Sequence, residues 1–193
     1  MPTSYGMEYV SGNFYTNQRQ RETNARYAYR FLSRIVGGWT IQAIAAMCGN
    51  WEVESSINPG IWEHLDYGNT SVGYGLVQWT PATKLINWAN PRGLDITDMA
   101  TALLRIDWEA ENQEQWTTTL PMSFTEFKHS TLSPYLLAQY FCRYYENPTS
   151  PDLNDRGLRG ERWYNFLLNV PLGRESKFWM YYAPKWREMK GRL

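Results

Sequence analysis

The chain has 193 residues, enough for one domain, or one domain and a short tail, with a substantial core. Nineteen basic and nineteen acidic residues give no formal net charge, so no single-sign field is available to attract nucleic acid or an anionic membrane. The longest apolar stretches are far shorter than the roughly 20 residues of a membrane-spanning helix, so we expect no span.

The sequence offers little to hold a metal ion or a cofactor. Its two histidines, His64 and His129, stand alone, with no cysteine or histidine at zinc-ligand spacing. Phosphate-binding loops and dinucleotide-binding glycine motifs are absent. We therefore expect no metal site and no cofactor.

The first two predicted elements are helices. Apolar residues at three- and four-residue steps predict a helix over 17–36, which Gly37 and Gly38 end. Thr40 is a suitable N-cap for a second helix, from Ile41 to about Ser55.

Residues 61–79 have a different pattern. A turn-rich stretch over 66–71 leads into the alternating, glycine-containing stretch 72–79. This pattern predicts a small β-hairpin lobe inserted after the second helix.

The rest of the chain again favours helices. We predict them from Pro81 to about 89, from Asp95 or Thr97 to about Gln113, over 123–129, from Pro134 to about Tyr145, and from Arg159 to Leu168. The predicted fold class is therefore mainly α, an α+β arrangement in which a helical domain carries a small β-hairpin lobe beside a groove. Residues 1–172 form the predicted domain, and 173–193 a basic, aromatic C-terminal tail or linker.

Glu54, at the end of the second predicted helix, is the leading candidate for an acid catalyst. Met47, Trp51 and Glu54 follow one another at steps of four and three residues, so they share one helix face. An indole and a thioether disfavour the charged form of a neighbouring carboxyl group, and a carboxyl group that keeps its proton can donate it to a leaving oxygen. The alternative is a solvated helix-end charge, or a partner for the turn at Asn58.

Three other glutamates compete with Glu54. Glu52 lies away from the face of Trp51, and we expect it to be a surface charge or to pair with an arginine of the first helix. Glu63 precedes the turn-rich stretch. Glu146 closes a helix, where backbone N–H groups or an arginine would be its partners.

Asp66 is the candidate for a second acid, because it lies at the mouth of the predicted lobe. If the reaction is glycoside hydrolysis, two carboxyl groups about 6.5–9.5 Å apart would leave room for a water and predict inversion of the anomeric configuration. A separation of about 5–5.5 Å would predict retention of that configuration. The alternative for Asp66 is an ordinary turn residue.

The lobe also carries candidate substrate-binding residues. The Gln78 amide could hold a sugar N-acetyl group or position a water, while Tyr74 and Trp79 could stack on sugar faces. Asn69 and Thr70 could add polar contacts. The alternative for these residues is ordinary hydrogen bonding within the turn and hairpin.

Two motifs carry a family resemblance: Gly49-Asn50-x-x-x-Glu54-Ser55-x-Ile57-Asn58-Pro59-Gly60, and Asp66-x-Gly68-Asn69-Thr70-Ser71-x-Gly73-x-Gly75-Leu76-Val77-Gln78-Trp79-Thr80-Pro81. The chain resembles the phage tail lysozyme family, especially the lysozyme domain of tail-tip proteins of phi29-like podoviruses. Two further matches are Ile86-Asn87-Trp88-Ala89-Asn90 and Tyr145-Glu146-x-Pro148, and the resemblance covers roughly residues 24–168.

The resemblance implies a lysozyme-like fold and a muramidase that cleaves peptidoglycan glycan strands, with Glu54 as the catalytic acid. It implies a place in the virion, at the tail tip, and makes other phage tail proteins candidate partners. Lytic transglycosylases share the Glu-Ser and Gly-Leu-x-Gln pair more loosely, so that activity is a second hypothesis. An endolysin, and a non-catalytic module that binds the wall or builds the tail, complete the set of functions compatible with these motifs.

Overall fold

The computed structural model describes residues 3–4, 6–119 and 121–172, and these are mainly helical, which confirms the predicted fold class. In chain order the elements are β1 (Thr3–Ser4), β2 (Met7–Glu8), α1 (Gln18–Arg30), η1 (Phe31–Val36), α2 (Ile41–Glu54), η2 (Glu63–Leu65), α3 (Thr83–Ala89), η3 (Asn90–Arg92), α4 (Met99–Asn112), α5 (Phe124–His129), α6 (Pro134–Phe141), η4 (Cys142–Glu146) and α7 (Leu153–Leu168). The elements η1 and η4 are π-helical, and η2 and η3 are short 3₁₀ helices. The predicted tail, 173–193, lies outside the described residues.

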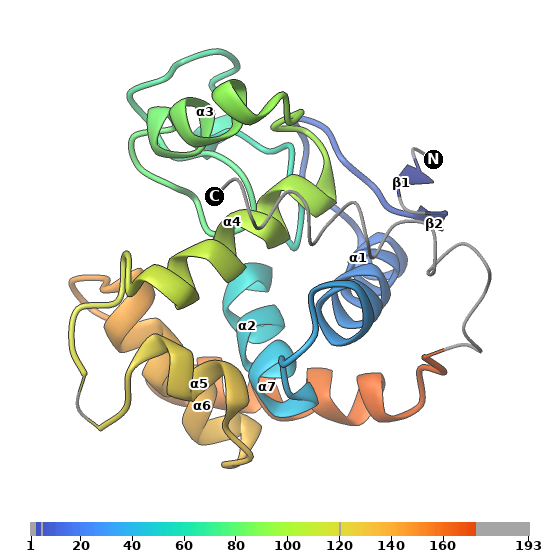
Figure 1. The fold of residues 1–193 in the computed structure, drawn as a ribbon, viewed down its shortest axis with the longest axis vertical. Helices are drawn as coiled ribbons and strands as arrows, with labels where there is room; N and C mark the ends of the chain where they lie inside the picture. The colour runs from blue at the N-terminus through green and yellow to red at the C-terminus, as the bar shows by residue number, and fades with distance from the viewer. Residues whose placement is uncertain (1–2, 5, 120, 173–193) are drawn as a thin grey trace.

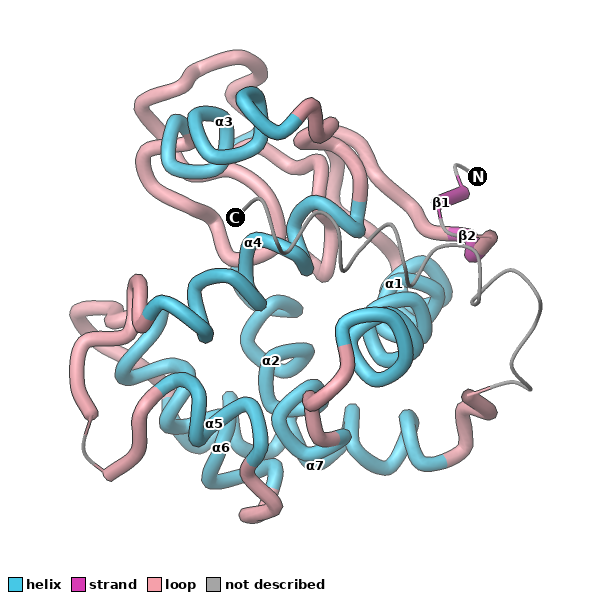
Figure 2. The backbone as a smooth tube through the Cα atoms, in the orientation of Figure 1, coloured by secondary structure: helices cyan, strands magenta, loops and turns pink. Residues whose placement is uncertain are grey.

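Helix α2 is the centre of the helical part. It packs against α1, α5, α6 and α7, and Figure 1 shows it running through the middle of the molecule. The long loops that connect α2 to α3 gather with α3 at one end, as Figure 2 shows, while α5, α6 and α7 lie at the other end. Helix α3 packs against α4, which connects the two parts. β1 and β2 pair with each other as a short antiparallel ladder.

Local capping determines where several helices begin. The Thr40 side chain accepts a hydrogen bond from the Ala43 N–H at 3.2 Å, which confirms the predicted N-cap of α2. Asp98 caps α4 by accepting from the Ala100 N–H at 2.9 Å, so the helix begins at Met99, whereas the predicted start was Asp95 or Thr97. Helix α3 begins at Thr83, two residues later than predicted.

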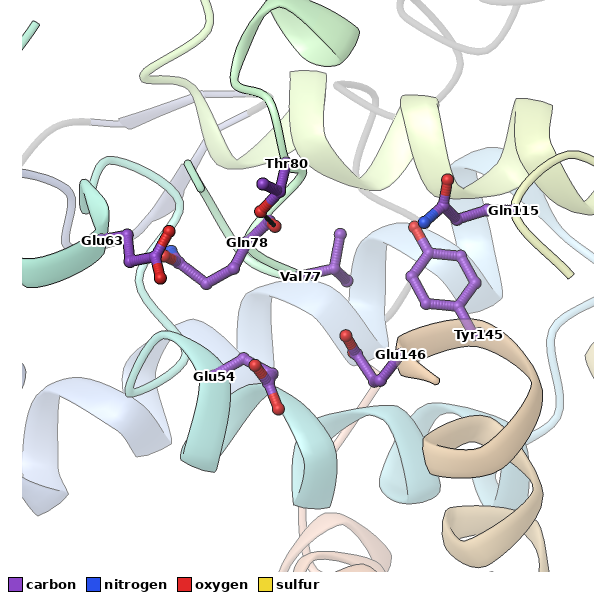
Figure 3. A pocket seen from close by; sticks show the side chains of 8 residues that line it. All are labelled: Glu54, Glu63, Val77, Gln78, Thr80, Gln115, Tyr145 and Glu146. Atoms are coloured by element: carbon purple, nitrogen blue, oxygen red, sulfur yellow. Dashed lines mark hydrogen bonds between the residues drawn. The ribbon is translucent and has the colours of Figure 1, made fainter. Parts of the chain in front are cut away.

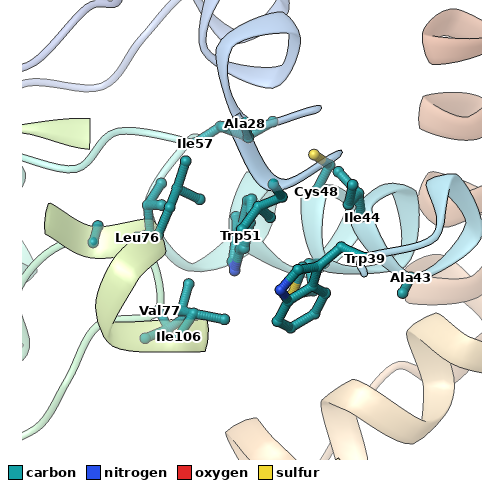
Figure 4. Close-up of a cluster of buried hydrophobic side chains, with 14 of the residues drawn as sticks. Ala28, Trp39, Ala43, Ile44, Cys48, Trp51, Ile57, Leu76, Val77 and Ile106 are labelled. Atoms are coloured by element: carbon teal, nitrogen blue, oxygen red, sulfur yellow. The ribbon is translucent and has the colours of Figure 1, made fainter. Parts of the chain in front are cut away.

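From Ala43 to Glu52, helix α2 is buried on every side rather than on one stripe. All residues from Ala43 to Glu52 are buried. Met47 and Trp51, expected to flank Glu54 at a groove, are fully buried in the core, and Figure 4 shows Trp51 among Ile57, Leu76 and other apolar side chains. Because helices and the lobe cover every face of α2, its apolar residues need not follow one stripe.

Glycines allow α2, α6 and α7 to approach closely. A Cβ on Gly49 would lie 2.7 Å from the Gly160 nitrogen, and a Cβ on Gly160 would lie 2.7 Å from the Pro134 carbonyl oxygen. Both distances are to backbone atoms, which cannot rotate away. The crossing of α2 with α7 therefore requires glycine at position 49, and the packing of α7 against α6 requires glycine at position 160.

Helix α7 starts at Leu153, six residues before the predicted start at Arg159. The missed first turns contain Gly157, and glycine is a poor helix former. In the structure Gly157 packs against the Tyr135 ring, so its lack of a side chain serves packing. The missed turns carry the buried Arg156.

The predicted hairpin lobe over 61–79 is held by two isolated antiparallel bridges, Trp62 with Tyr74 and Tyr74 with Trp79, rather than by strands. Residues 75–78 form a tight turn, for which Gly75 has a φ of 80°. The Ser55 hydroxyl donates to the Leu76 carbonyl oxygen at 2.8 Å and ties this turn to the end of α2. The lobe therefore lies directly against the helix that carries Glu54.

Among the described residues, no helix combines the length and apolar character needed to cross a bilayer.

Candidate active site

A cavity of about 300 Å³ lies where the lobe meets the helical part, at the C-terminal end of α2. Pockets that hold small ligands start at about this size. Figure 3 shows its lining side chains: Glu54, Glu63, Val77, Gln78, Thr80, Gln115, Tyr145 and Glu146. The lining is mostly polar and contains three carboxyl groups, so it suits a substrate rich in hydrogen-bonding groups.

Glu54 reaches the cavity from the last turn of α2. Its Oε1 accepts a hydrogen bond from Arg156 Nη2 at 2.6 Å, and its side chain is 24% exposed. Arg156 also donates from Nη1 to the Asn50 carbonyl oxygen at 3.0 Å, so the guanidinium is fixed against α2. The observed partner of Glu54 is thus an arginine from α7, which no pattern in the sequence had indicated.

Gln78 lines the cavity from the lobe, and in Figure 3 its side chain extends toward Glu63. Its Nε2 donates to the carbonyl oxygens of Gly75 at 2.9 Å and Ile61 at 3.3 Å, which fixes the amide in one orientation. Within the described part of the chain its Oε1 accepts no hydrogen bond. A fixed amide with a free acceptor oxygen can bind a donor group of a ligand, such as a hydroxyl or an amide N–H.

Glu63 stabilises the lobe in addition to lining the cavity. Its Oε2 accepts from the Gly73 N–H at 2.7 Å, and its Oε1 lies 3.5 Å from His64 Nε2. The Glu63 N–H donates in turn to the Gly73 carbonyl oxygen at 2.9 Å. The contacts of Glu63 are therefore those of a residue that shapes the lobe.

Glu146 is the last residue of η4, and Figure 3 shows its carboxyl group directed into the cavity. Its Oε1 is buried and has no hydrogen-bond partner within residues 6–119 and 121–172. Burial above all, and then the charge of Glu54, raise the pKa of Glu146 well above its usual range, although Arg156 opposes the shift. Glu146 was expected to bind backbone N–H groups or an arginine, and among the described residues Oε1 receives no such hydrogen bond.

A buried network supports this side of the cavity. Glu109 on α4 accepts hydrogen bonds from Trp79 Nε1 at 2.9 Å, from Arg105 Nε at 2.8 Å and from the Tyr145 hydroxyl. Burial raises the pKa of Glu109, and the three donors oppose that rise. The network joins the lobe, α4 and η4, and so fixes Tyr145 and the adjacent Glu146 relative to the lobe.

Only two of the predicted site residues, Glu54 and Gln78, line the same cavity. Asp66 is exposed and accepts from Asn69 Nδ2 at 2.7 Å, while Asn69 Oδ1 accepts from the Ser71 N–H at 3.1 Å. Hydrogen bonds of this kind are typical of turn residues. Thr70 is exposed on the same turn. The catalytic role of Asp66 and the binding roles of Asn69 and Thr70 stay predictions.

The two aromatic candidates lie in the core. Tyr74 is 1% exposed and Trp79 is 1% exposed, so neither ring offers a face to a sugar in this structure. The Tyr74 hydroxyl donates to the Ile96 carbonyl oxygen, and Trp79 belongs to the Glu109 network. The turn over 75–78 breaks the expected strand alternation, which is why Val77 and Gln78 both reach the cavity.

Glu52, the closest rival of Glu54 in sequence, does not line the cavity. Its buried carboxylate pairs with Arg21 of α1 at 3.0 Å, which confirms the predicted ion pair with the first helix. Arg162 of α7 and Trp163 Nε1 also bind it. Glu52 therefore connects three helices and is fully occupied by structural contacts.

The site predicted from the sequence lacked six cavity residues and the Glu54 partner Arg156; the six are Glu63, Val77, Thr80, Gln115, Tyr145 and Glu146. Motif membership was the available signal, because Val77 and Thr80 stand in the second motif of the resemblance and Tyr145-Glu146-x-Pro148 is a further match. Within the described residues no group of three or more histidine, cysteine or carboxylate side chains is arranged to hold a metal ion.

Comparison with known proteins adds a second line of argument. The sequence model of the family described as phage tail lysozyme matches residues 23–167. The chain belongs to the phage tail lysozyme family. The chain is also 46% identical over 159 residues to Morphogenesis protein 1 of Bacillus phage B103. That alignment covers 82% of this chain and 43% of the relative, so the chain spans less than half the length of that protein.

The match to the phage tail lysozyme family includes every residue that lines the cavity, from Glu54 to Glu146, and Arg156 as well. The resemblance inferred from the Glu54 and Gln78 motifs is thereby confirmed.

Proposed function

We propose that this phage tail lysozyme cleaves the glycan strands of peptidoglycan as a muramidase, with Glu54 as the general acid. In this reaction Glu54 protonates the glycosidic oxygen that follows N-acetylmuramic acid, and a water completes the hydrolysis. The observation that carries the proposal is that Glu54 and Gln78 both line one polar cavity, in a chain of this family.

The cavity supports a polysaccharide substrate for two physical reasons. Its polar groups come from separate elements, Glu54 from α2, Gln78 from the lobe and Glu146 from η4, so a bound sugar would be contacted from several sides. The amide of Gln78 has its nitrogen engaged, and its oxygen accepts no hydrogen bond from the described residues, which suits a hydroxyl or N-acetyl N–H donor.

The biological setting that we propose is local opening of the host cell wall at the start of infection, by an enzyme carried at the tail tip of the virion. The phage origin of the similar Morphogenesis protein 1 supports a phage protein. Other tail proteins are proposed partners, and Asp66 is the helper acid suggested by the sequence.

The test is incubation of the purified chain with purified sacculi, followed by mass spectrometry of the soluble fragments. Fragments with reducing N-acetylmuramic acid ends are the expected products of a muramidase. Fragments with anhydro ends would instead indicate a lytic transglycosylase, in which the 6-hydroxyl group of the sugar attacks. Binding to sacculi without soluble fragments would contradict the enzymatic proposal and indicate a wall-binding or structural module.

A further inference from the structure

Glu146 and Glu54 approach the same cavity from different elements. Glu54 comes from the end of α2, and Glu146 from the end of η4, more than ninety positions later in the chain. In Figure 3 both carboxyl groups are directed into the cavity. Asp66 was the second acid predicted from the sequence, but Glu63 and Glu146 are the carboxyl groups that line the cavity with Glu54. Glu63 accepts a hydrogen bond from the Gly73 N–H at 2.7 Å and shapes the lobe, which leaves Glu146 as the candidate partner of Glu54.

The contacts of the two carboxyl groups differ sharply. Glu54 is bound by the Arg156 guanidinium at 2.6 Å. Glu146 Oε1 is buried without a hydrogen-bond partner in the described part of the chain, although Arg156 lies near enough to influence it electrostatically. A buried carboxylate oxygen without a donor is costly, whereas a protonated carboxyl group avoids most of that cost.

The surroundings of Glu146 hold more negative than positive charge. The titratable and charged groups that face it are Glu54 from α2, Glu63 across the cavity, Glu109 from α4, Cys142 and Tyr145 from η4 itself, and Arg156 from α7. Arg156 is already committed to Glu54 and the Asn50 carbonyl oxygen. Glu54 and Glu146 line one cavity and influence each other electrostatically, so we expect them to titrate together, with their protons belonging to the pair.

We propose that Glu146 works with Glu54 as a carboxyl pair that carries one proton into the reaction. This inference rests on the proposed glycan cleavage and deepens it. The glycosidic C–O bond breaks, and its oxygen takes the proton of the pair and leaves as a hydroxyl group. The attacking hydroxyl, from water or from the sugar, forms the new bond to the anomeric carbon and releases one proton, which returns to the pair. The proton count of the enzyme is therefore unchanged after each turnover.

The first test measures release of soluble muropeptides from purified sacculi between about pH 4 and about pH 9 for the wild type and Glu146→Gln. Glu161→Gln, an exposed glutamate of α7, is the matched control. We expect Glu146→Gln to release muropeptides about 10- to 100-fold more slowly at neutral pH. Its pH optimum should shift to lower pH, because the site then has one carboxyl group fewer to hold a proton. The control should keep the wild-type profile.

If the rate of muropeptide release by Glu146→Gln depends on pH as the wild-type rate does, the inference is overturned, whatever the absolute rate. A purely structural role lowers the rate equally at every pH. That outcome leaves the proposed function intact, since the wild type is still active. A wild type that releases no fragments at any pH would instead contradict the proposed function itself, and this inference with it.

A second measurement does not depend on the folding of Glu146→Gln. Carboxyl ¹³C NMR follows the titration of Glu146 in the wild type and in Glu54→Gln. We expect its midpoint to fall in Glu54→Gln, because the neighbouring charge that opposes ionisation has been removed. An unchanged midpoint would show that the two carboxyl groups do not titrate as a pair and would overturn the inference.

Discussion

Replacement of Arg156 by methionine tests whether α7 holds Glu54 in place. The Arg156 side chain is 9% exposed and makes two contacts across to α2, at 2.6 Å to Glu54 Oε1 and at 3.0 Å to the Asn50 carbonyl oxygen. Methionine keeps much of the aliphatic volume but removes both hydrogen bonds and the positive charge. The change therefore isolates the polar connection between the helices.

The expected loss of stability follows from these two contacts. Both hydrogen bonds are donated by the charged guanidinium, and a hydrogen bond to a charged group contributes about 1.5–3 kcal/mol. Water can reach Glu54, whose side chain is 24% exposed, and will replace part of the lost interaction, so the low end of that range, or less, applies to each contact. We expect Arg156→Met to lower the free energy of unfolding by about 2–3 kcal/mol, which lowers Tm by about 4–12 °C in a domain of this size.

The assay is urea unfolding at neutral pH, followed by tryptophan fluorescence and analysed by linear extrapolation. Arg19→Met, at an exposed position of α1, is the control and should change stability by less than about 0.5 kcal/mol. An Arg156→Met variant as stable as that control would refute the assignment of Arg156 as the residue that fixes Glu54.

Three further predictions concern packing, pH dependence and the predicted second acid. Gly160→Ala should cost about 1–2 kcal/mol, because its Cβ would lie 2.7 Å from a backbone carbonyl oxygen of α6, which outweighs the helix propensity that it gains. Gly157→Ala meets side-chain atoms of Tyr135 rather than backbone atoms, and side chains shift more easily than backbone, so chemical denaturation should show Gly157→Ala to be more stable than Gly160→Ala; the reverse order would contradict the packing argument. At a pH between the ordinary glutamate pKa and the raised pKa of folded Glu146, the folded state binds a proton that the unfolded state has released. The free energy of unfolding of the wild type therefore falls as pH rises through that window, by up to about 1.4 kcal/mol per pH unit. Glu146→Gln lacks this slope, and its stability relative to the wild type should increase with pH; two parallel curves would be inconsistent with a raised pKa. Asp66→Asn should lower muropeptide release only partially if Asp66 assists the reaction, whereas wild-type turnover would make it a turn residue alone.

Local signals predicted much of the fold and part of the site. The Thr40 cap and the glycine pair that follows the first helix fix the start of α2, and these depend only on neighbouring residues. The ion pair of Glu52 with Arg21 could be predicted because an acidic residue away from the cleft face needs a nearby cation. Glu54 and Gln78 could be assigned to one site from the sequence because they stand in two motifs whose spacing matches a known family.

The remaining features depend on contacts between distant parts of the chain. Arg156 reaches Glu54 because α2 and α7 cross at Gly49 and Gly160, and glycine within α7 obscured the start of that helix in the sequence. The burial of Trp79 follows from its hydrogen bond to Glu109, thirty positions away. Glu146 stands out by the absence of a hydrogen-bond partner for Oε1 among the described residues, and only three-dimensional contacts reveal this.

The most direct measurement of the central claim compares Glu54→Gln with the wild type on the same preparation of purified sacculi. Glutamine keeps the shape of the side chain but cannot donate the proton, so release of soluble muropeptides should fall by about 100-fold or more while the unfolding midpoint shows a folded protein. A folded Glu54→Gln variant that releases muropeptides at the wild-type rate would contradict the account.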